Sequence, residues 1–290
     1  MTNTQAQFKS ELSSQFCDVS QGRMHYHEAG NGETIVFLHG IPGSSNSWIK
    51  VAEELSRDFH VIVPDLMGFG RSSKPQSDYY MTGQSKCLYE LLVKKDVQDI
   101  YLVGHDFGGP VSVTFSKQHP DIRVKKMALM ATNLFIDTPI PGPMKIAKVP
   151  LLGQLFFKMM AGTTFGFKQM YKQGAYYKQE FTLAEFSKHI SSNNKYFTYK
   201  IFYKSLADLK KNYAEVQKRL GEIEIPVLIV WGDKDPFFPV SVGDRSAMAI
   251  KYSTMITYKD TGHFIPEERP AKLVNDLRRF ILNRDLIRGR

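Results

Sequence analysis

The sequence predicts an α/β fold built on a mostly parallel sheet, and three observations lead to this class. Short, continuously apolar runs recur along the 290 residues, as in strands buried on both faces. Amphipathic stretches with helical spacing separate these runs. Neither an internal repeat nor an apolar run of the roughly 18 to 20 residues needed for a membrane-spanning helix interrupts the alternation.

The expected strands are short and evenly distributed. The apolar runs lie at residues 34–38, 60–64, 100–103, 126–130 and 226–231, with a further strand expected at 255–258. Residues 23–28 alternate in polarity and predict an early antiparallel strand. Helices are expected at residues 47–56, 81–94 and 271–283. Strands that alternate with helices imply right-handed crossovers and parallel neighbours.

The alternation stops between Leu134 and Glu215. This segment opens with four prolines, continues with aromatic residues at helical spacing, and contains no convincing strand run. We therefore expect a core made of residues 1–133 and 216–290, and a helical cap made of residues 134–215. A cap can exclude water from a site placed at the carboxyl ends of the strands.

The net charge of +9 is concentrated in the expected cap, which has twelve Lys, no Arg and five acidic residues. Lys lacks the planar guanidinium that reads phosphate in a bidentate manner, and these lysines are dispersed as on a solvated face. We therefore expect no nucleic-acid partner and no membrane partner. A nucleic-acid or membrane-surface binder that uses the basic cap is kept as an alternative.

Cys17 and Cys87 are the only cysteines, too few for a disulfide framework. The polar first sixteen residues lack the apolar segment of a secretory signal. Together these features favour a cytoplasmic protein, either a monomer or a homodimer. No sequence pattern calls for a metal or an organic cofactor.

The motif most directly linked to chemistry is Gly-His-Asp-Phe-Gly-Gly at residues 104–109, between a predicted strand and a predicted helix. A nucleophile flanked by glycines in this context is typical of a nucleophile elbow. Here the nucleophile position holds Asp106. A carboxylate attacks an sp³ carbon that bears a leaving group, and forms an alkyl ester that water must then hydrolyse. The alternative is a glycine-rich turn with an Asp that caps the helix.

Two further motifs supply the partners of Asp106. His263, in Thr-Gly-His-Phe at residues 261–264, follows the last strand and is expected to be the general base that activates water. Residues 231–236, Trp-Gly-Asp-Lys-Asp-Pro, offer two carboxylates to orient it. We favour Asp235 over Asp233, with a simple turn role for both as the alternative.

The motif His-Gly-Ile-Pro-Gly at residues 39–43 follows the first parallel strand. The backbone N–H groups of Ile41 and Phe107 are expected to form an oxyanion hole for the ester intermediate. A plain β-turn is the alternative interpretation of this motif. The substrate pocket is expected to include four side chains near these motifs: His39, Pro42, His105 and Phe202.

These motifs, together with Asp-Leu-Met-Gly-Phe-Gly-Arg-Ser at residues 65–72, resemble the α/β-hydrolase superfamily in order and spacing over essentially the whole chain. Asp at the elbow narrows the resemblance to the branch of epoxide hydrolases and haloalkane or haloacetate dehalogenases. Lipases and esterases of this fold have Ser at that position. The resemblance implies an eight-stranded, mostly parallel sheet with a helical lid after the sixth strand.

Several positions depart from the dehalogenase pattern. Haloalkane dehalogenases usually have Trp directly after the nucleophile, and many have Asn or Glu at the position of Ile41, whereas fluoroacetate dehalogenases have Arg next to the nucleophile. This chain has Phe107, whose side chain has no N–H donor. In one dehalogenase subgroup the carboxylate that orients the histidine lies near the position of Asn133. Asn133 is not acidic, so the resemblance implies that Asp235 orients His263.

The resemblance therefore favours hydrolysis of a small, apolar epoxide to a diol, with water as second substrate. Epoxide hydrolases use two lid tyrosines as donors to the epoxide oxygen, and Phe202-Tyr203-Lys204 resembles one of their motifs. Tyr203 is one candidate donor, with packing against the core as its alternative role, and the other donor is left among Tyr177, Tyr171 and Tyr176. A dehalogenase, and a weakly active or ligand-binding protein of the same fold, are the alternative functions.

Overall fold

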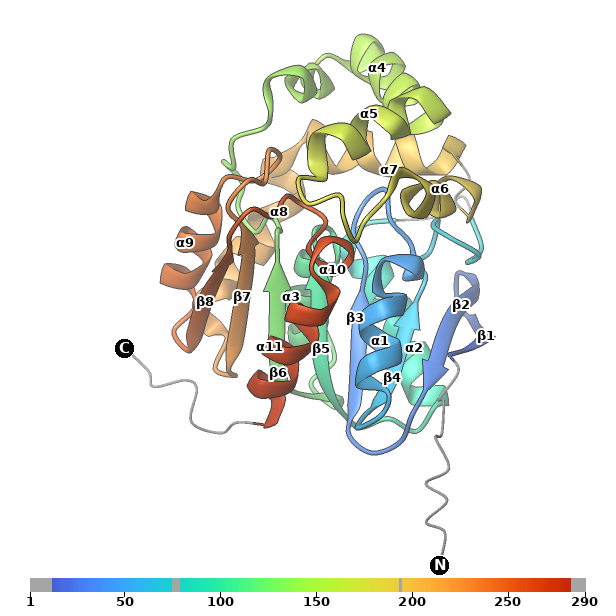
Figure 1. Ribbon diagram of the computed structural model, residues 1–290, viewed down its shortest axis with the longest axis vertical. Helices are drawn as coiled ribbons and strands as arrows, with labels where there is room; N and C mark the ends of the chain where they lie inside the picture. Colours follow the sequence, from blue (N-terminus) through green and yellow to red (C-terminus); the bar gives the residue numbers. More distant parts are fainter. Residues whose placement is uncertain (1–11, 75–78, 193–194, 283–290) are drawn as a thin grey trace, which may run out of the picture.

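The structure is a computed structural model that describes residues 12–74, 79–192 and 195–282. Eight strands form one sheet in the order β1-β2-β4-β3-β5-β6-β7-β8 (Figure 1). β1 and β2 run antiparallel to their neighbours, and all the other pairs are parallel. The eight-stranded, mostly parallel sheet is thereby confirmed. Its strands are β1 Ser13–Val19, β2 Gly22–Ala29, β3 Thr34–Leu38, β4 His60–Pro64, β5 Asp99–His105, β6 Arg123–Met130, β7 Val227–Gly232 and β8 Ser253–Tyr258.

Strand β1 has no counterpart among the strands expected from sequence. Most of its side chains are exposed or only partly buried, and it pairs with β2 alone at the edge of the sheet. An edge strand with little core to cover does not need an apolar run, so its sequence carries no clear signal. The first eleven residues, which contributed to the expectation of no secretory signal, lie outside the described residues.

Helices cover both faces of the sheet, because alternate strand residues point to opposite sides. Val36 and Leu102 belong to a core cluster with α2 (Met81–Lys94) and α3 (Gly108–Gln118). Phe37 belongs to a second cluster, with helices that lie in front of the sheet in Figure 1. These are α1 (Ile49–Leu55), which follows the 3-10 helix η1 (Ser45–Trp48), and α11 (Pro270–Leu282). Two more helices follow β7 and β8, α9 (Val240–Ala249) and α10 (Ile265–Glu268).

The chain between β6 and β7 is helical in its described part and lies at the carboxyl ends of the parallel strands (Figure 1). Its elements are η2 Gly142–Lys148, α4 Pro150–Gly162, α5 Thr164–Gly174, α6 Leu183–Ser192, α7 Lys195–Ala207, α8 Leu209–Arg219 and η3 Leu220–Glu222. An aromatic cluster that includes Phe167, Phe181 and Phe186 packs this segment against Phe264. The division into a core and a cap stays a prediction.

The arrangement places the ends of β5, β7 and β8 on one side, beneath the inserted helices (Figure 1). The residues directly after these strands carry the three predicted catalytic side chains. Within the described ranges, none of the helices combines the length and the apolar character required to span a bilayer.

Candidate active site

Asp106 stands on the sharp turn between β5 and α3. Its φ of 47° lies in the left-handed region, which is uncommon for a residue other than glycine and costs free energy. The flanking positions leave no room for a side chain, since a Cβ on Gly104 would lie 2.5 Å from the carbonyl oxygen of Gly108. Two hydrogen bonds to its backbone fix the turn: Asp106 N donates to Met130 O at 3.1 Å, and the side-chain hydroxyl of Thr132 donates to Asp106 O at 2.6 Å.

The Asp106 carboxylate lies in a pair of backbone amides. Ile41 N donates to its Oδ2 at 2.7 Å, and the N–H of Phe107 also hydrogen-bonds to the carboxylate. Burial raises the pKa of Asp106, while His263 and these two amides act in the opposite direction without cancelling the effect. The peptide bond between Ile41 and Pro42 is cis. The two amides expected to form an oxyanion hole thus already hold the Asp106 carboxylate.

His263 is paired with Asp235. Its Nδ1 lies 2.9 Å from Asp235 Oδ2, and both side chains are almost completely buried. Asp235 is fixed in turn, because its Oδ1 accepts hydrogen bonds from the amides of Phe237 and Phe238. Burial alone would lower the pKa of His263, but the charges of Asp235 and Asp106 and the bond to Asp235 outweigh it and raise the pKa to about 9.

The second aspartate of the motif has a different position. Asp233 Oδ1 accepts a hydrogen bond from Thr261 N at 3.2 Å, and its Oδ2 lies 3.2 Å from Lys234 Nζ. It therefore ties the turn after β7 to the loop after β8. The geometry brings Asp235, and not Asp233, to the imidazole.

Glu268 supports the His263 loop and was not singled out from the sequence. Its buried carboxylate accepts hydrogen bonds from the N–H groups of Gly262 and Phe264, on either side of His263. It also accepts from the N–H groups of Tyr176 and Tyr177, in the segment after α5. Burial raises its pKa, although these four bonds favour the charged form. The only feature of the sequence that could have indicated this role of Glu268 is that an acidic residue lies in the turn after His263.

An apolar cavity with about 570 Å³ of empty space, including its opening, connects these groups. Asp106 and His263 line it together with Asn133 and Thr138. Its remaining walls are apolar: Ile41, Pro42, Pro139, Ile140, Pro141, Met144, Met170, Phe202, Leu206, Leu209, Phe237, Phe238 and Phe264.

Of the four predicted pocket side chains, Pro42 and Phe202 line this cavity. His39 and His105 are buried and are absent from its described lining, which corrects the expectation. His39 Nδ1 donates to Gly40 O and its Nε2 accepts from Leu66 N, so the ring is committed to its own loop. Burial lowers the pKa of His39 to about 4.

His105 is turned toward the neighbouring loop. Its Nε2 donates to the carbonyl oxygen of His263 at 2.9 Å, and its buried Nδ1 has no hydrogen-bond partner among the described residues. Burial lowers the pKa of His105 well below the usual value. Both histidines are therefore neutral, and their hydrogen bonds stabilise the loops behind the site.

The tyrosines expected as donors do not line the described cavity wall. Tyr203 packs on Phe157 of α4, with ring centroids 6.1 Å apart. Tyr177 donates its hydroxyl to Gln179 Oε1 at 2.7 Å and stacks under the Arg269 guanidinium. Helical spacing does not predict which face of α7 lines the cavity. In the structure Phe202 lines it and Tyr203 does not.

A different tyrosine, Tyr213 of α8, is buried beside the site. Burial raises its pKa and the charge of Asp106 raises it further, while a hydrogen bond with the Asn133 side chain lowers it. Tyr213 is therefore a protonated phenol close enough for the charge of Asp106 to affect its pKa. Its position on the apolar stripe with Leu209 and Val216 is a sequence signal that could have indicated an inward-facing side chain.

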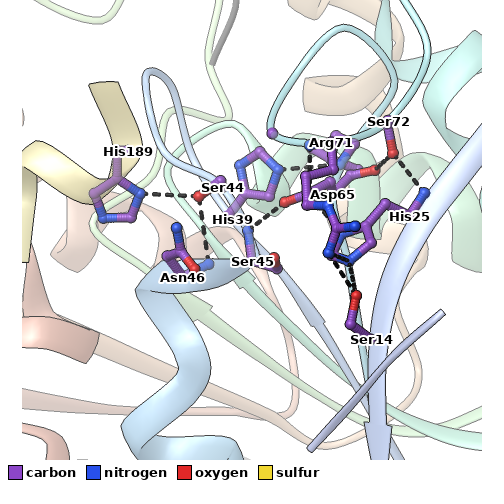
Figure 2. Close-up of polar contacts among 12 residues, drawn as sticks. Ser14, His25, His39, Ser44, Ser45, Asn46, Asp65, Arg71, Ser72 and His189 are labelled. Carbon is purple, nitrogen blue, oxygen red and sulfur yellow. Dashed lines mark hydrogen bonds and ion pairs between the residues drawn. The ribbon is translucent and has the colours of Figure 1, made fainter. Parts of the chain in front are cut away.

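A buried polar network holds the 39–46 loop from behind (Figure 2). Asp65 Oδ2 accepts from His25 Nδ1 at 2.7 Å and from Arg71 N at 2.8 Å, and its Oδ1 accepts from Ser45 N at 2.7 Å. Burial opposes ionisation of Asp65, but His25 and these amides hold its pKa far below the usual range. The loop that supplies the Ile41 amide is thus anchored to a charged, fully buried carboxylate.

The inserted helices contact the same loop. His189 of α6 lies with its Nδ1 3.0 Å from Ser44 Oγ (Figure 2) and its Nε2 3.6 Å from Glu267 Oε1. His263 N donates to Gly174 O, at the end of α5. Within the described ranges, no group of three or more His, Cys, Asp or Glu side chains is arranged to hold a metal ion.

The sequence of this chain is similar to known hydrolases. Residues 33–270 match the family model of the alpha/beta hydrolase fold. Lipase 1 of Psychrobacter immobilis is 32% identical over 266 residues, which cover 88% of this chain and 80% of the lipase.

Solved structures agree in fold. The epoxide hydrolase CorEH superimposes with a TM-score of 0.73 at 22% identity, covering 93% of this chain and 99% of that one. The haloalkane dehalogenase DbeA from Bradyrhizobium elkani USDA94 gives a TM-score of 0.78 at 19% identity, with 92% and 96% covered. At these identities the likeness supports the fold alone.

Proposed function

Since the chain belongs to the α/β-hydrolase family, we propose that it hydrolyses a small, apolar epoxide to a diol through a covalent ester on Asp106. The observation that carries this proposal is the position of the Asp106 carboxylate, with Oδ2 bound to the Ile41 amide at 2.7 Å and the group facing an apolar cavity. A carboxylate held in this way has one oxygen available for attack.

In the first step the oxygen of Asp106 that Ile41 does not hold attacks an epoxide carbon. The C–O bond of the epoxide breaks, and the released alkoxide needs a proton. Tyr213 is the donor that we propose. It does not line the described cavity itself, but it is buried next to Asn133, which does, and burial together with the charge of Asp106 raises its pKa, so the phenol is protonated at neutral pH. Asn133 lines the cavity and lowers the pKa of Tyr213, so it is the polar group that connects the phenol to the site in this proposal.

In the second step His263 Nε2 removes a proton from water, which attacks the Asp106 ester carbon. The carbonyl oxygen of the ester, which the amide pair still holds, becomes an oxyanion, and the N–H groups of Ile41 and Phe107 stabilise it. The tetrahedral intermediate expels the diol oxygen, which takes the proton back from His263. Asp106 is then a carboxylic acid and Tyr213 is still the phenolate left by the first step. Asp106 loses its proton to solvent and Tyr213 takes one up, so one epoxide and one water give one diol.

The charges of the site favour this order. Asp106 is one of the groups that raise the pKa of His263 to about 9 in the resting enzyme. Ester formation neutralises Asp106 and removes that contribution. The imidazole then loses its proton more readily, just when a neutral base is needed.

A dehalogenase would use the same nucleophile and base, and the fold of DbeA fits this chain equally well. A departing halide, however, needs N–H donors. Besides the His263 imidazole, the Asn133 amide is the one N–H donor among the side chains of the described cavity wall, and its Nδ2 already donates to Phe135 O at 3.1 Å. Epoxide opening, which needs a proton instead, agrees better with the buried phenol.

The decisive experiment uses His263→Gln, which should stall the second step and retain the ester. The variant is incubated with small apolar epoxides and haloalkanes, and its intact mass is measured. A gain equal to a whole epoxide supports the proposal, whereas a gain equal to an alkyl group without its halogen identifies a dehalogenase. The matched control, Asp106→Ala combined with His263→Gln, should gain no mass. A folded His263→Gln protein with no adduct would sink the proposal and favour a weakly active or ligand-binding protein.

A further inference from the structure

Helix α4 is apolar on two opposite faces. Gly153, Phe157 and Ala161 are buried at four-residue spacing, and Phe157 packs against Phe202 of α7 with ring centroids 5.0 Å apart. Leu151 and Leu155, on another side of the helix, are 83% and 65% exposed. An amphipathic helix normally buries its apolar side chains against the core and turns polar ones to solvent, so the exposed leucines of α4 are unusual.

The exposed face extends beyond these two leucines. α4 lies at the outer end of the inserted helices, above α5 (Figure 1). Six large apolar side chains that are about half exposed or more gather on α4, the residue before it and the start of α5: Val149, Leu151, Leu152, Leu155, Met159 and Phe165. We call this set the α4 surface. Isolated exposed leucines are ordinary, but a contiguous apolar set marks an interaction site.

The stretch of sequence that carries the α4 surface has charge of a single sign. Residues 138–179 contain no Asp, Glu or Arg and six lysines, all of them exposed: Lys145, Lys148, Lys158, Lys168, Lys172 and Lys178. Within the described parts of the chain, no ion pair involves any of the six. Exposed leucine and phenylalanine surrounded by lysine is the composition of helices that lie in the interface of an anionic membrane.

We propose that the α4 surface docks on an anionic lipid bilayer, with its apolar side chains among the lipid chains and its lysines at the headgroups. A second copy of this chain is a poorer occupant, because two such surfaces would bring two sets of unpaired lysines together. The sequence alone predicts no membrane partner. The exposure of these leucines, which spacing cannot provide, argues for one.

The test is flotation of the protein with vesicles of phosphatidylcholine alone or mixed with phosphatidylglycerol. Wild type should bind the mixed vesicles, less so as salt rises, since charges are screened over about 8 Å at physiological ionic strength. Leu151→Ser combined with Leu155→Ser should weaken binding by about tenfold or more. The control, Val93→Ser with Met248→Ser, changes two apolar residues on α2 and α9 that are 50% and 73% exposed and should bind as wild type does.

The replaced side chains are exposed, so circular dichroism should show both variants folded. Absence of wild-type binding at low salt, or equal binding by the Leu151→Ser/Leu155→Ser variant, would overturn the proposal. So would a wild-type dimer, seen by ultracentrifugation, that this variant dissociates while vesicles bind neither form. Binding does not require turnover, so an Asp106→Ala protein should float like wild type even if the proposed chemistry is wrong.

Discussion

The N–H of Ile41 donates a hydrogen bond of 2.7 Å to Oδ2 of Asp106. In an enzyme with a serine nucleophile, the corresponding amides await an oxygen of the substrate. Here they hold an oxygen of the enzyme itself, which in the proposed mechanism becomes the carbonyl oxygen of the ester and then the oxyanion. A substrate of this mechanism needs no carbonyl group, which agrees with a cavity whose walls are almost entirely apolar.

Replacement of Asp235 by Asn should slow ester hydrolysis by about 10³- to 10⁴-fold, because His263 loses its orienting charge. The pKa of His263 should also fall, since Asp235 makes the main contribution that raises it. Asp233→Asn is the matched control, because Asp233 contacts Thr261 and Lys234 instead. Single-turnover kinetics on a reactive epoxide would measure both variants, and an equal loss in both would contradict the assignment of Asp235.

Tyr213→Phe should lower the rate of ester formation from an epoxide by about 100-fold, the usual scale of a lost general acid. Tyr203→Phe removes the same hydroxyl from a ring that packs on Phe157 and should leave the rate nearly unchanged. Accumulation of the ester in a His263→Gln background gives the rates directly. Loss with Tyr203→Phe alone would return the donor role to α7.

Glu268→Gln should destabilise the fold by about 1 to 3 kcal/mol, because an amide NH₂ would face at least one of the four backbone N–H groups now bound to the carboxylate. The His263 loop should shift as well and reduce the turnover number. Urea unfolding measures the first effect, with the exposed Glu222→Gln as control. Unchanged stability would mean that these four bonds do not depend on the second carboxylate oxygen.

Stability should be greatest near pH 6.5, the ordinary pKa of histidine. His39 has a folded pKa of about 4, so the unfolded chain binds its proton first, and the free energy of unfolding falls as pH drops below 6.5. His263 has a folded pKa of about 9, so its contribution is complete below 6.5 and is lost as pH rises toward 9. Each group contributes up to about 1.4 kcal/mol per pH unit.

Urea titrations between about pH 5 and pH 9 would follow this dependence, within the interval set by the two shifted pKa values. In His263→Gln the loss of stability on the alkaline side should become shallower, while the acid side should keep its slope. Stability that rises steadily from pH 6.5 to pH 9 in the wild type would contradict the raised pKa of His263.

The residues that the sequence identified are those held by local motifs. The elbow at Asp106 is fixed by its glycines and its two neighbouring elements, and Asp235 lies where the end of a strand puts it. Contacts between distant segments could not be read in this way. The rotation of α7 that places Phe202 in the cavity wall and Tyr203 against Phe157 depends on how α7 packs on α4. Tyr213 lies near Asp106 only because α8 packs against α3. Strand β1 escaped detection because an edge needs little apolar surface.

The left-handed backbone of Asp106 has a consequence for any attempt to improve this protein by directed evolution. Glycine adopts a φ of 47° without a penalty, whereas aspartate is strained there and also brings a buried charge. Variants selected for heat resistance alone should therefore accumulate Asp106→Gly, which makes the fold more stable and removes the proposed nucleophile. Each round of screening must therefore measure turnover, because at position 106 selection for stability favours glycine and selection for the proposed activity favours aspartate.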